Sequence, residues 1–148
     1  MELQNIGVVI TGGASGMGAA TGKYLTELGA KVSLLDINMQ ALEATANKIN
    51  VTPIQCDVTK QESVSHALNL AEKANGPTRI SINCAGIIHT RRMVNQQGAM
   101  RLEEFQNVLN INLIGTFNVM RLASEKMIPL DLIKNSEERG IIINTASI

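Results

Sequence analysis

The segment Thr11–Gly18, with the sequence TGGASGMG, has glycines at the spacing of a nucleotide-binding turn. Gly12 permits a tight turn at the end of a strand, and Gly16 lets the backbone approach a pyrophosphate group without an intervening Cβ. Gly18 lets the following helix pack close to the sheet. Because the first N–H groups of a helix attract anions, and the Ser15 hydroxyl stands beside them, this segment predicts a phosphate-binding site.

Asp36 stands 18 residues beyond Gly18, at the end of the next apolar run. A carboxylate at this position can accept hydrogen bonds from both hydroxyls of an adenosine ribose, and it would repel a 2′-phosphate. The glycine segment contains no Arg or Lys that would neutralise such a phosphate. We therefore expect a dinucleotide site that prefers NAD to NADP.

A glycine-rich segment of this kind can serve three purposes besides dinucleotide binding. It can be a purely structural turn, although the presence of Asp36 argues against this. An ATP-binding P-loop fails because Gly22-Lys23 is followed by Tyr24, and because Met17 occupies the place of its first glycine. An S-adenosylmethionine site uses a similar glycine loop and acid, so it remains an open alternative.

Elements of alternating type must position these residues. Apolar runs separated by patterns of helical period predict five strands, at 6–10, 32–35, around Ile54, 79–83 and 141–143. Repeated βαβ units of this kind form one parallel sheet with helices on both faces. The sequence therefore predicts an α/β fold, a Rossmann-type doubly wound parallel sheet, as a single domain over residues 1–148.

The helices are predicted from their apolar stripes and end signals. The first helix is expected to face the sheet with Met17, Ala20, Tyr24, Leu25 and Leu28. Thr59 and Glu62 have the spacing of a capping box, which predicts the start of the third helix near Thr59.

The chain ends at Ile148, directly after the fifth predicted strand and without a helix to cover that strand. A doubly wound sheet that ends there would expose an apolar edge and face. We therefore expect a sheet truncated after its fifth strand, and a sequence that is cut short.

Composition argues against several classes of function. The 148 residues include 13 basic and 13 acidic side chains, so neither a nucleic-acid partner nor an anionic membrane surface is expected. No apolar run approaches the length of a membrane span. The N-terminus lacks the basic region of a secretory signal, which favours a cytoplasmic protein, with the mitochondrial matrix as the alternative. Cys56 and Cys84 have neither metal nor redox spacing, so reduced, buried thiols and no metal site are expected.

Four short motifs follow the glycine pattern T-G-x-x-x-G-x-G along the chain. They are Asp57-Val58, Asn83–Gly86 with the sequence NCAG, Asn112–Thr116 with NLIGT, and Asn144–Ser147 with NTAS. Together and in this order, the five motifs resemble the short-chain dehydrogenase/reductase family, and the resemblance covers the whole chain. It implies an oxidoreductase with NAD as cofactor and a small-molecule substrate.

The resemblance also implies roles for individual residues. Asp57-Val58 is similar to the family's adenine-contacting pair, and Asn83–Gly86 to its segment beside the nicotinamide ribose. Asn112 is similar to an asparagine that perturbs its helix and holds a water molecule in a proton relay, and Ser147 to the serine that orients the reacting oxygen. The implied catalytic residues are thus Ser147 and Asn112, and the implied cofactor-binding residues are Gly12, Ser15, Gly16, Met17, Gly18, Asp36, Asp57, Val58, Cys84 and Gly86.

Most of these residues could also have a simpler structural role. Asp57 could cap the helix that begins near Thr59, and Cys84 could be a small buried residue whose main chain makes any cofactor contact. Ser147 could be an ordinary polar residue at a strand end. Asn112 lowers helix propensity, so its place inside a helix requires a reason, which the resemblance supplies.

Three stretches are most similar to the type II 3-hydroxyacyl-CoA dehydrogenases of this family, namely Asn83–Ile87, Asn112–Leu122 and Arg139–Ser147. This similarity implies reversible oxidation of a 3-hydroxyacyl-CoA to the 3-ketoacyl-CoA, with a steroid, a sugar or another secondary alcohol as the alternative substrate. It also implies a homotetramer or homodimer, because the long helix predicted over 102–127 pairs with another subunit in this family.

One feature of the family is absent from the sequence. In the family, a tyrosine acts as general acid/base and a lysine four residues later lowers its pKa. Tyr24 is the only tyrosine of the chain, and the residue four places on is Leu28. We therefore expect the 148 residues alone not to catalyse hydride transfer, and a Tyr-x-x-x-Lys helix to be encoded beyond Ile148. The alternative is a catalytically silent NAD-binding module, which would have no chemical use for Ser147 or Asn112.

Overall fold

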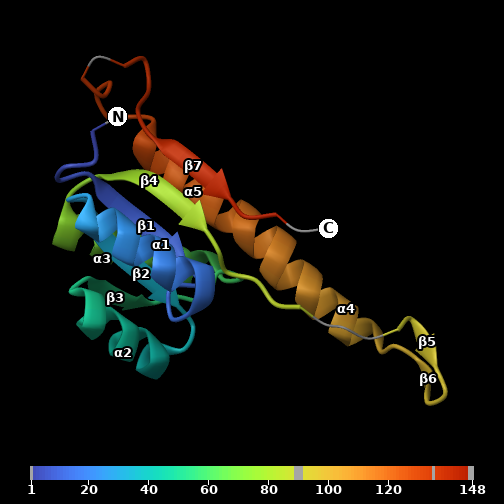
Figure 1. Cartoon of the computed structure of the whole chain (residues 1–148). Coiled ribbons are helices and arrows are strands. Elements are labelled where there is room, and N and C mark those ends of the chain that lie inside the picture. The colour runs from blue at the N-terminus through green and yellow to red at the C-terminus, as the bar shows by residue number, and fades with distance from the viewer. Residues whose placement is uncertain (1, 89–91, 135, 147–148) are drawn as a thin grey trace.

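Five parallel strands form one sheet in the computed structural model, which describes residues 2–88, 92–134 and 136–146 (Figure 1). The strand order is β3-β2-β1-β4-β7, with every neighbouring pair parallel. The strands are β1 Gly7–Thr11, β2 Lys31–Asp36, β3 Thr52–Gln55, β4 Thr78–Asn83 and β7 Ile141–Asn144. The predicted α/β class and Rossmann-type parallel sheet are therefore confirmed.

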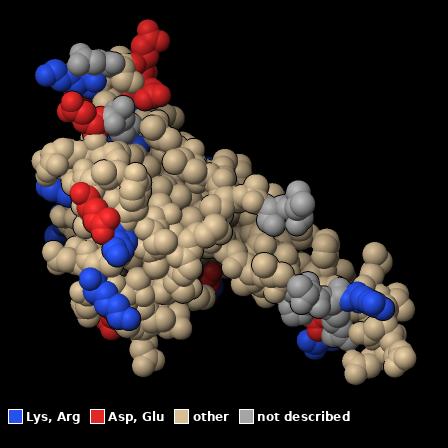
Figure 2. Space-filling model, viewed as in Figure 1, with Lys and Arg blue, Asp and Glu red and all other residues tan. Residues whose placement is uncertain are grey.

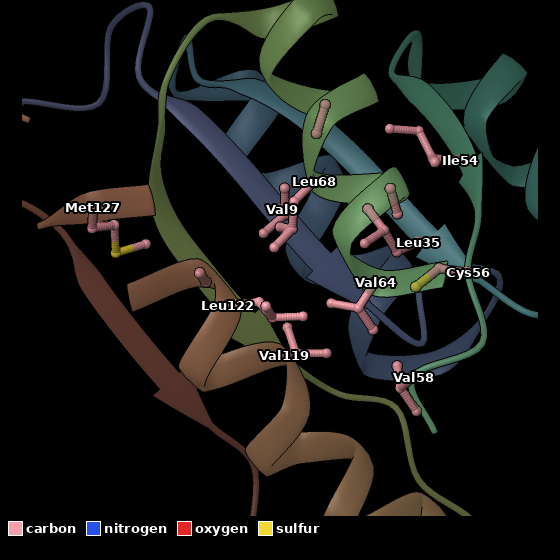
Figure 3. Close-up of a cluster of buried hydrophobic side chains, with 13 residues drawn as sticks. Val9, Leu35, Ile54, Cys56, Val58, Val64, Leu68, Val119, Leu122 and Met127 are labelled. Atoms are coloured by element: carbon pink, nitrogen blue, oxygen red, sulfur yellow. The ribbon is translucent and has the colours of Figure 1, made fainter. Parts of the chain in front are cut away.

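Helices cover both faces of this sheet (Figure 1). They are α1 Gly16–Glu27, α2 Met39–Ile49, α3 Gln61–Asn75, α4 Leu102–Leu109 and α5 Thr116–Met127. On one face, Val8 of β1 packs in a cluster with Leu42 of α2. On the other face, Val9 packs in a second cluster with Val64 of α3 and Val119 of α5 (Figure 3). Because successive side chains of a strand point to opposite faces, β1 supplies both cores.

Helix α1 packs on the sheet mainly through glycines, and only part of the predicted apolar stripe faces the core. Gly18 and Gly22 are its buried residues, and a Cβ on Gly22 would approach a side chain of β2 to 2.8 Å. Met17, Tyr24 and Leu28 are instead exposed, Tyr24 by 62%. The predicted core face is therefore wrong for these three residues, because the helix backbone lies too close to the sheet for large side chains to fit between them. It is right for Leu25, which is half-buried and packs against the cluster that contains Val8 and Leu42.

The helical region predicted over 102–127 is a continuous rod with an irregular middle. Between α4 and α5, the residues Asn110–Gly115 form a π-helical turn, η1. Such turns are rare and are frequent at functional sites. Asn112 lies within η1, which confirms the prediction that the helix is perturbed at this asparagine.

A small hairpin projects beyond the start of α4 (Figure 1). Its strands are β5 Val94–Asn95 and β6 Gly98–Ala99, which pair antiparallel. No strand was predicted there, because two residues per strand are too few to produce an alternating apolar pattern.

Strand β7 lies at the edge of the sheet, beside β4. Ile143 is exposed there, and Ile141 and Ile142 are half-buried. The expectation of an exposed apolar edge at the fifth strand is therefore met. The loop before β7 is bound to β4 by Arg79, whose side chain donates hydrogen bonds to the backbone carbonyls of Asp131 and Arg139.

Candidate functional site

A cavity of about 460 Å³ lies at the carboxyl ends of β1, β2, β3 and β4. In doubly wound sheets, ligands bind at this edge, where the strand order reverses, here between β1 and β4. The lining includes all ten implied cofactor residues, namely Gly12, Ser15, Gly16, Met17, Gly18, Asp36, Asp57, Val58, Cys84 and Gly86. The other lining residues are Leu35, Ile37, Cys56, Thr59, Ala85, Ile87, Asn107 and Ile111. Motifs far apart in the sequence thus meet at a single site.

The glycine segment turns from β1 into α1 and leaves open space at Gly16. Gly12 and Gly16 have φ values of +67° and +53°, in the left-handed region that favours glycine. A Cβ on Gly12 would lie 2.8 Å from the backbone of Cys84 and Ala85, and one on Gly18 would overlap the carbonyl oxygen of Gly12. A Cβ on Gly16 would meet nothing within 4 Å. Gly12 and Gly18 therefore serve the fold, whereas the space at Gly16 is available to a ligand.

The start of α1 offers backbone donors to the cavity. Ser15 is the N-cap residue, and its side chain makes no capping hydrogen bond. The first N–H groups of a helix have no acceptor within the helix, and Gly16, Met17 and Gly18 all line the cavity. These N–H groups and the positive end of the helix dipole suit a phosphate anion.

Asp36 is the last residue of β2, and it lines the cavity. Its Oδ2 accepts a hydrogen bond from the Ala14 N–H at 3.1 Å, and its Oδ1 accepts one from the Asn38 N–H at 3.0 Å. An ionised carboxylate has about four lone-pair sites, so both oxygens keep capacity for further donors. Asp36 therefore fixes the glycine segment and can still accept hydrogen bonds from a ligand.

Asp57 is held in a turn that leads into α3. Its Oδ1 accepts hydrogen bonds from the N–H and the hydroxyl of Thr59, and its Oδ2 lies 3.3 Å from the Nζ of Lys60. Burial alone would raise the pKa of Asp57, but the Thr59 hydrogen bonds and the Lys60 charge outweigh it and hold this pKa below its usual value. Asp57 is thus an ionised lining residue at neutral pH.

The capping box predicted at Thr59 and Glu62 is wrong. Helix α3 begins at Gln61, and its N-cap residue, Lys60, makes no side-chain capping hydrogen bond. The turn that Asp57 stabilises holds Thr59 one residue before the N-cap position, where its hydroxyl donates to the Asp57 carboxylate instead. Asp57 was given a helix cap as its alternative structural role. Its carboxylate instead stabilises the turn just before α3, because it accepts hydrogen bonds from Thr59 and not from the first turn of the helix.

Asn112 does not line the cavity, but it binds Ile87, which does. Its Oδ1 accepts a hydrogen bond from the Ile87 N–H at 2.9 Å, and its Nδ2 donates one to the Ile87 carbonyl at 2.8 Å. A Cβ on Gly86 would approach Asn112 Oδ1 to 3.4 Å, so little space separates the two segments. The π-helical turn therefore fixes the chain that leaves β4 along the cavity.

Ser147 lies outside the described residues, but the chain just before it is anchored to β4. The N–H and the hydroxyl of Thr145 both donate to the carbonyl of Asn83, at 3.1 and 2.8 Å. The Nδ2 of Asn83 donates to Asn144 Oδ1 at 2.8 Å. These bonds hold the segment that leads to Ser147 at the carboxyl edge of the sheet, on which the cavity also lies.

Two positioning residues were not predicted. The hydroxyl of Thr45 in α2 donates to the Ala14 carbonyl at 2.7 Å, and the Nδ2 of Asn118 in α5 donates to the Val58 carbonyl at 2.9 Å. Their partners lie 31 and 60 residues away along the chain, so no local spacing could reveal them. Asn118 alone carries a hint, because a polar residue within an apolar stripe requires a hydrogen-bond partner when buried.

Cys56 and Cys84 are free thiols that line the cavity. Burial raises the pKa of Cys56 to about 11, although a hydrogen bond with Ser63 opposes this shift and the charges of Asp57 and Asp36 add to it. Burial also raises the pKa of Cys84. Both side chains are therefore protonated at neutral pH. The expected burial is confirmed for Cys56, whereas Cys84 is only half-buried.

Residues 2–88, 92–134 and 136–146 contain neither a metal-binding cluster nor a membrane helix. Within these ranges, no three His, Cys, Asp or Glu side chains are grouped as a metal ion would require. No helix in the same ranges combines the length and the apolar character needed to cross a membrane.

A parallel five-stranded sheet with helices on both faces, a glycine-rich turn and a cavity at the strand ends together define a Rossmann-like nucleotide-binding fold. The sequence profile of one family with this fold, described as short chain dehydrogenase, matches residues 7–148. The chain belongs to this family of oxidoreductases, whose members generally use nicotinamide cofactors.

The relatives share both sequence and structure with this chain. The 3-hydroxyacyl-CoA dehydrogenase type-2 of Homo sapiens is 41% identical over 151 residues, which cover 99% of this chain and 58% of the human protein. A short-chain type dehydrogenase/reductase from Mycobacterium marinum is 30% identical with a TM-score of 0.85, covering 99% of this chain and 57% of that one. The 3-hydroxyacyl-CoA dehydrogenase type-2 from Mycobacterium avium is 26% identical with a TM-score of 0.87, covering 97% and 57%. The chain therefore spans less than two thirds of the length of these relatives.

Proposed function

We propose that the cavity binds NAD and that the protein oxidises a 3-hydroxyacyl-CoA to the 3-ketoacyl-CoA. The position of Asp36 carries the cofactor assignment, because its carboxylate lies in the same cavity as the phosphate-binding turn and keeps acceptor capacity. The open space at Gly16 supports the fit, since a pyrophosphate group needs a close approach to the backbone there.

Different residues of the cavity would bind different parts of the dinucleotide. The N–H groups at the start of α1 would bind the pyrophosphate, Asp36 the adenosine ribose, and Asp57-Val58 the adenine. The chain fixed by Asn112 would border the nicotinamide end. A bound nicotinamide dinucleotide supplies the acceptor for the hydride, and Ser147 would donate a hydrogen bond that orients the reacting oxygen of the substrate.

Replacing Asp36 by alanine should narrow the preference of the chain for NADH over NADPH by at least about tenfold. The substitution removes the acceptor for the ribose hydroxyls and the repulsion of the 2′-phosphate, and like charges in contact cost several kcal/mol. Calorimetric titration of both nucleotides into the wild-type and Asp36→Ala proteins measures the two ratios.

Asp57→Asn is the matched control, because it removes a second carboxylate from the same cavity. The Asp57 side chain is already bonded to Thr59 and Lys60, so its loss should leave the NADH to NADPH ratio unchanged. Equal binding of NADH and NADPH by the wild-type chain contradicts the NAD assignment.

The substrate assignment is supported by the relatives named 3-hydroxyacyl-CoA dehydrogenase type-2, one of which is 41% identical to this chain. The test begins by determining whether the reading frame continues beyond Ile148 into a Tyr-x-x-x-Lys helix. If it does, the complete protein that it encodes, here called the full product, should oxidise NADH with acetoacetyl-CoA as substrate. Turnover of a steroid or sugar ketone without turnover of acetoacetyl-CoA rejects the acyl-CoA assignment and leaves the family intact.

We also propose that this full product forms a homodimer or homotetramer through the rod of α4, η1 and α5. Exposed apolar side chains follow one another along the rod, namely Leu102, Phe105, Leu109, Leu113 and Phe117. In the view of Figure 2, charged side chains lie at the top and on the left side of the molecule and near the hairpin, and most of the surface between them is neither basic nor acidic. An apolar stripe of this kind is typical of a surface that pairs with another chain, and light scattering of the full product measures its state.

A further inference from the structure

The glycine segment is held from two sides at one residue, Ala14. The Ala14 N–H donates to the Oδ2 of Asp36 at 3.1 Å, and the Ala14 carbonyl accepts a hydrogen bond from the Thr45 hydroxyl at 2.7 Å. One residue earlier, the Gly13 N–H donates to the Leu35 carbonyl at 3.0 Å. The Asp36 and Leu35 contacts come from the neighbouring strand, whereas the Thr45 contact comes from helix α2.

We propose that Thr45 is a positioning residue for the phosphate-binding turn, which deepens the proposed NAD site and rests on it. The Ala14 carbonyl and the Ser15 N–H belong to one trans peptide plane and therefore point in opposite directions. By binding the carbonyl, Thr45 fixes the Ser15 N–H to point away from α2. Ser15 lines the cavity, so this bond sets the orientation of a donor at the site where a phosphate would lie.

The alternative orientation of this peptide would oppose anion binding. If the Ala14–Ser15 peptide plane rotated by half a turn, the Ala14 carbonyl oxygen would point where the Ser15 N–H now points. A carbonyl dipole presents negative charge and repels a phosphate, whereas a backbone N–H attracts it. The Thr45 hydroxyl therefore selects the binding orientation before a nucleotide arrives, which lowers the cost of ordering the turn on binding.

Thr45 is well placed for this role because its helix is firmly packed. Leu42 and Ala46 are fully buried neighbours on α2. A half-buried threonine in a helix commonly bonds the carbonyl four residues earlier in its own helix, but Thr45 reaches across to the Ala14 carbonyl, 31 residues away. A hydroxyl on a rigid, packed element holds its partner more accurately than one on a loop.

Thr45→Val tests the proposal, because valine keeps the shape of threonine and lacks its hydroxyl. We expect this variant to bind ADP-ribose, which contains a pyrophosphate, about three- to tenfold more weakly than the wild-type chain, the range typical of one lost hydrogen bond. Binding of adenosine, which has no phosphate, should change by less than about twofold. Thr45→Ser keeps the hydroxyl and should restore ADP-ribose binding. Titration calorimetry for ADP-ribose and ligand-observed NMR for adenosine measure these affinities.

Thr26→Val is the matched control, because the Thr26 hydroxyl also donates to a backbone carbonyl, that of Gly22 within α1, at 2.8 Å. It removes the same kind of bond outside the cavity and should leave ADP-ribose binding unchanged. Wild-type affinity of Thr45→Val for ADP-ribose, or an equal loss for adenosine and ADP-ribose, overturns the positioning role. A wild-type chain that binds neither NADH nor ADP-ribose overturns the proposed NAD site itself, and the role of Thr45 with it.

Discussion

Replacing Gly16 by alanine is expected to leave the protein folded and to weaken NADH binding by about tenfold to a hundredfold. A Cβ at this position meets no protein atom within 4 Å, so it enters the space that the proposed pyrophosphate would fill. An added methyl group in a filled space typically costs about 1–3 kcal/mol, which corresponds to this loss of affinity. The φ value of +53° adds a folding cost of about 1–2 kcal/mol for a residue other than glycine.

Gly18→Ala should give the opposite result, a destabilised fold. Its Cβ would overlap the carbonyl oxygen of Gly12, and a backbone atom cannot move aside as a side chain can. We expect a loss of about 3 kcal/mol in the free energy of unfolding, the upper end of the usual range for overpacking, and a fall in Tm of roughly 10 °C. Thermal melts followed by circular dichroism, together with NADH titration, separate the two variants.

Gly76→Ala is the control for backbone strain without a ligand effect. Gly76 has a φ of +79° and open space around its Cβ position, but it ends α3 and does not line the cavity. This variant should lose stability and keep its affinity for NADH. If Gly16→Ala also keeps full NADH affinity, the open space at Gly16 is not where a pyrophosphate lies.

The motifs of the cavity were predictable because each is a contiguous stretch at a strand end. Parallel strands place all their carboxyl ends on one edge, so the order of the glycine segment, Asp36, Asp57-Val58 and Asn83–Gly86 was sufficient to bring them together. The irregularity at Asn112 was implied by the resemblance rather than by propensity alone. The structure adds what no resemblance had stated, the pair of hydrogen bonds from Asn112 to Ile87.

The packing of α1 was mispredicted because the periodicity rule assumes that large side chains fill the space between a helix and a sheet. Gly18 and Gly22 lie four residues apart on one face of α1 and are its buried residues. The close helix–sheet contact was predicted at Gly18, and the four-residue spacing to Gly22 would have extended that prediction along the helix. Met17 and Tyr24 follow the same helical period, but they lie on exposed faces.

Contacts between distant segments could not be predicted from local patterns. The Thr45–Ala14 and Asn118–Val58 hydrogen bonds depend on which helix lies beside which strand end, and this is fixed only by the complete packing of the domain. The Thr59 case shows a local pattern overridden by a competing local contact. The Asp57 carboxylate accepts hydrogen bonds from Thr59 before the helix begins, so the capping-box spacing is present without its structure.

The 148-residue chain is expected to transfer hydride at least about a hundredfold more slowly than a short-chain dehydrogenase that carries the Tyr-x-x-x-Lys pair. General acid–base catalysis typically contributes about a hundredfold to ten-thousandfold. The only tyrosine, Tyr24, is 62% exposed on α1 and is not among the residues that line the cavity. The described lining residues include no tyrosine, lysine or histidine. NADH oxidation with acetoacetyl-CoA measures the rate, with a dehydrogenase that carries the pair as positive control.

Two acidic groups of the cavity, Asp57 and Cys84, do not replace this pair. Asp57 is ionised at neutral pH because its pKa is lowered, so it has no proton to give. Cys84 keeps its proton, since burial raises its pKa, and a thiol with a raised pKa donates that proton less readily. A rate comparable to the positive control would therefore require another acid, and loss of that rate in Tyr24→Phe would identify Tyr24 as that acid. The expected result is NADH binding without turnover. That result would mean that the 148 residues carry the proposed nucleotide site but lack the group that transfers the proton.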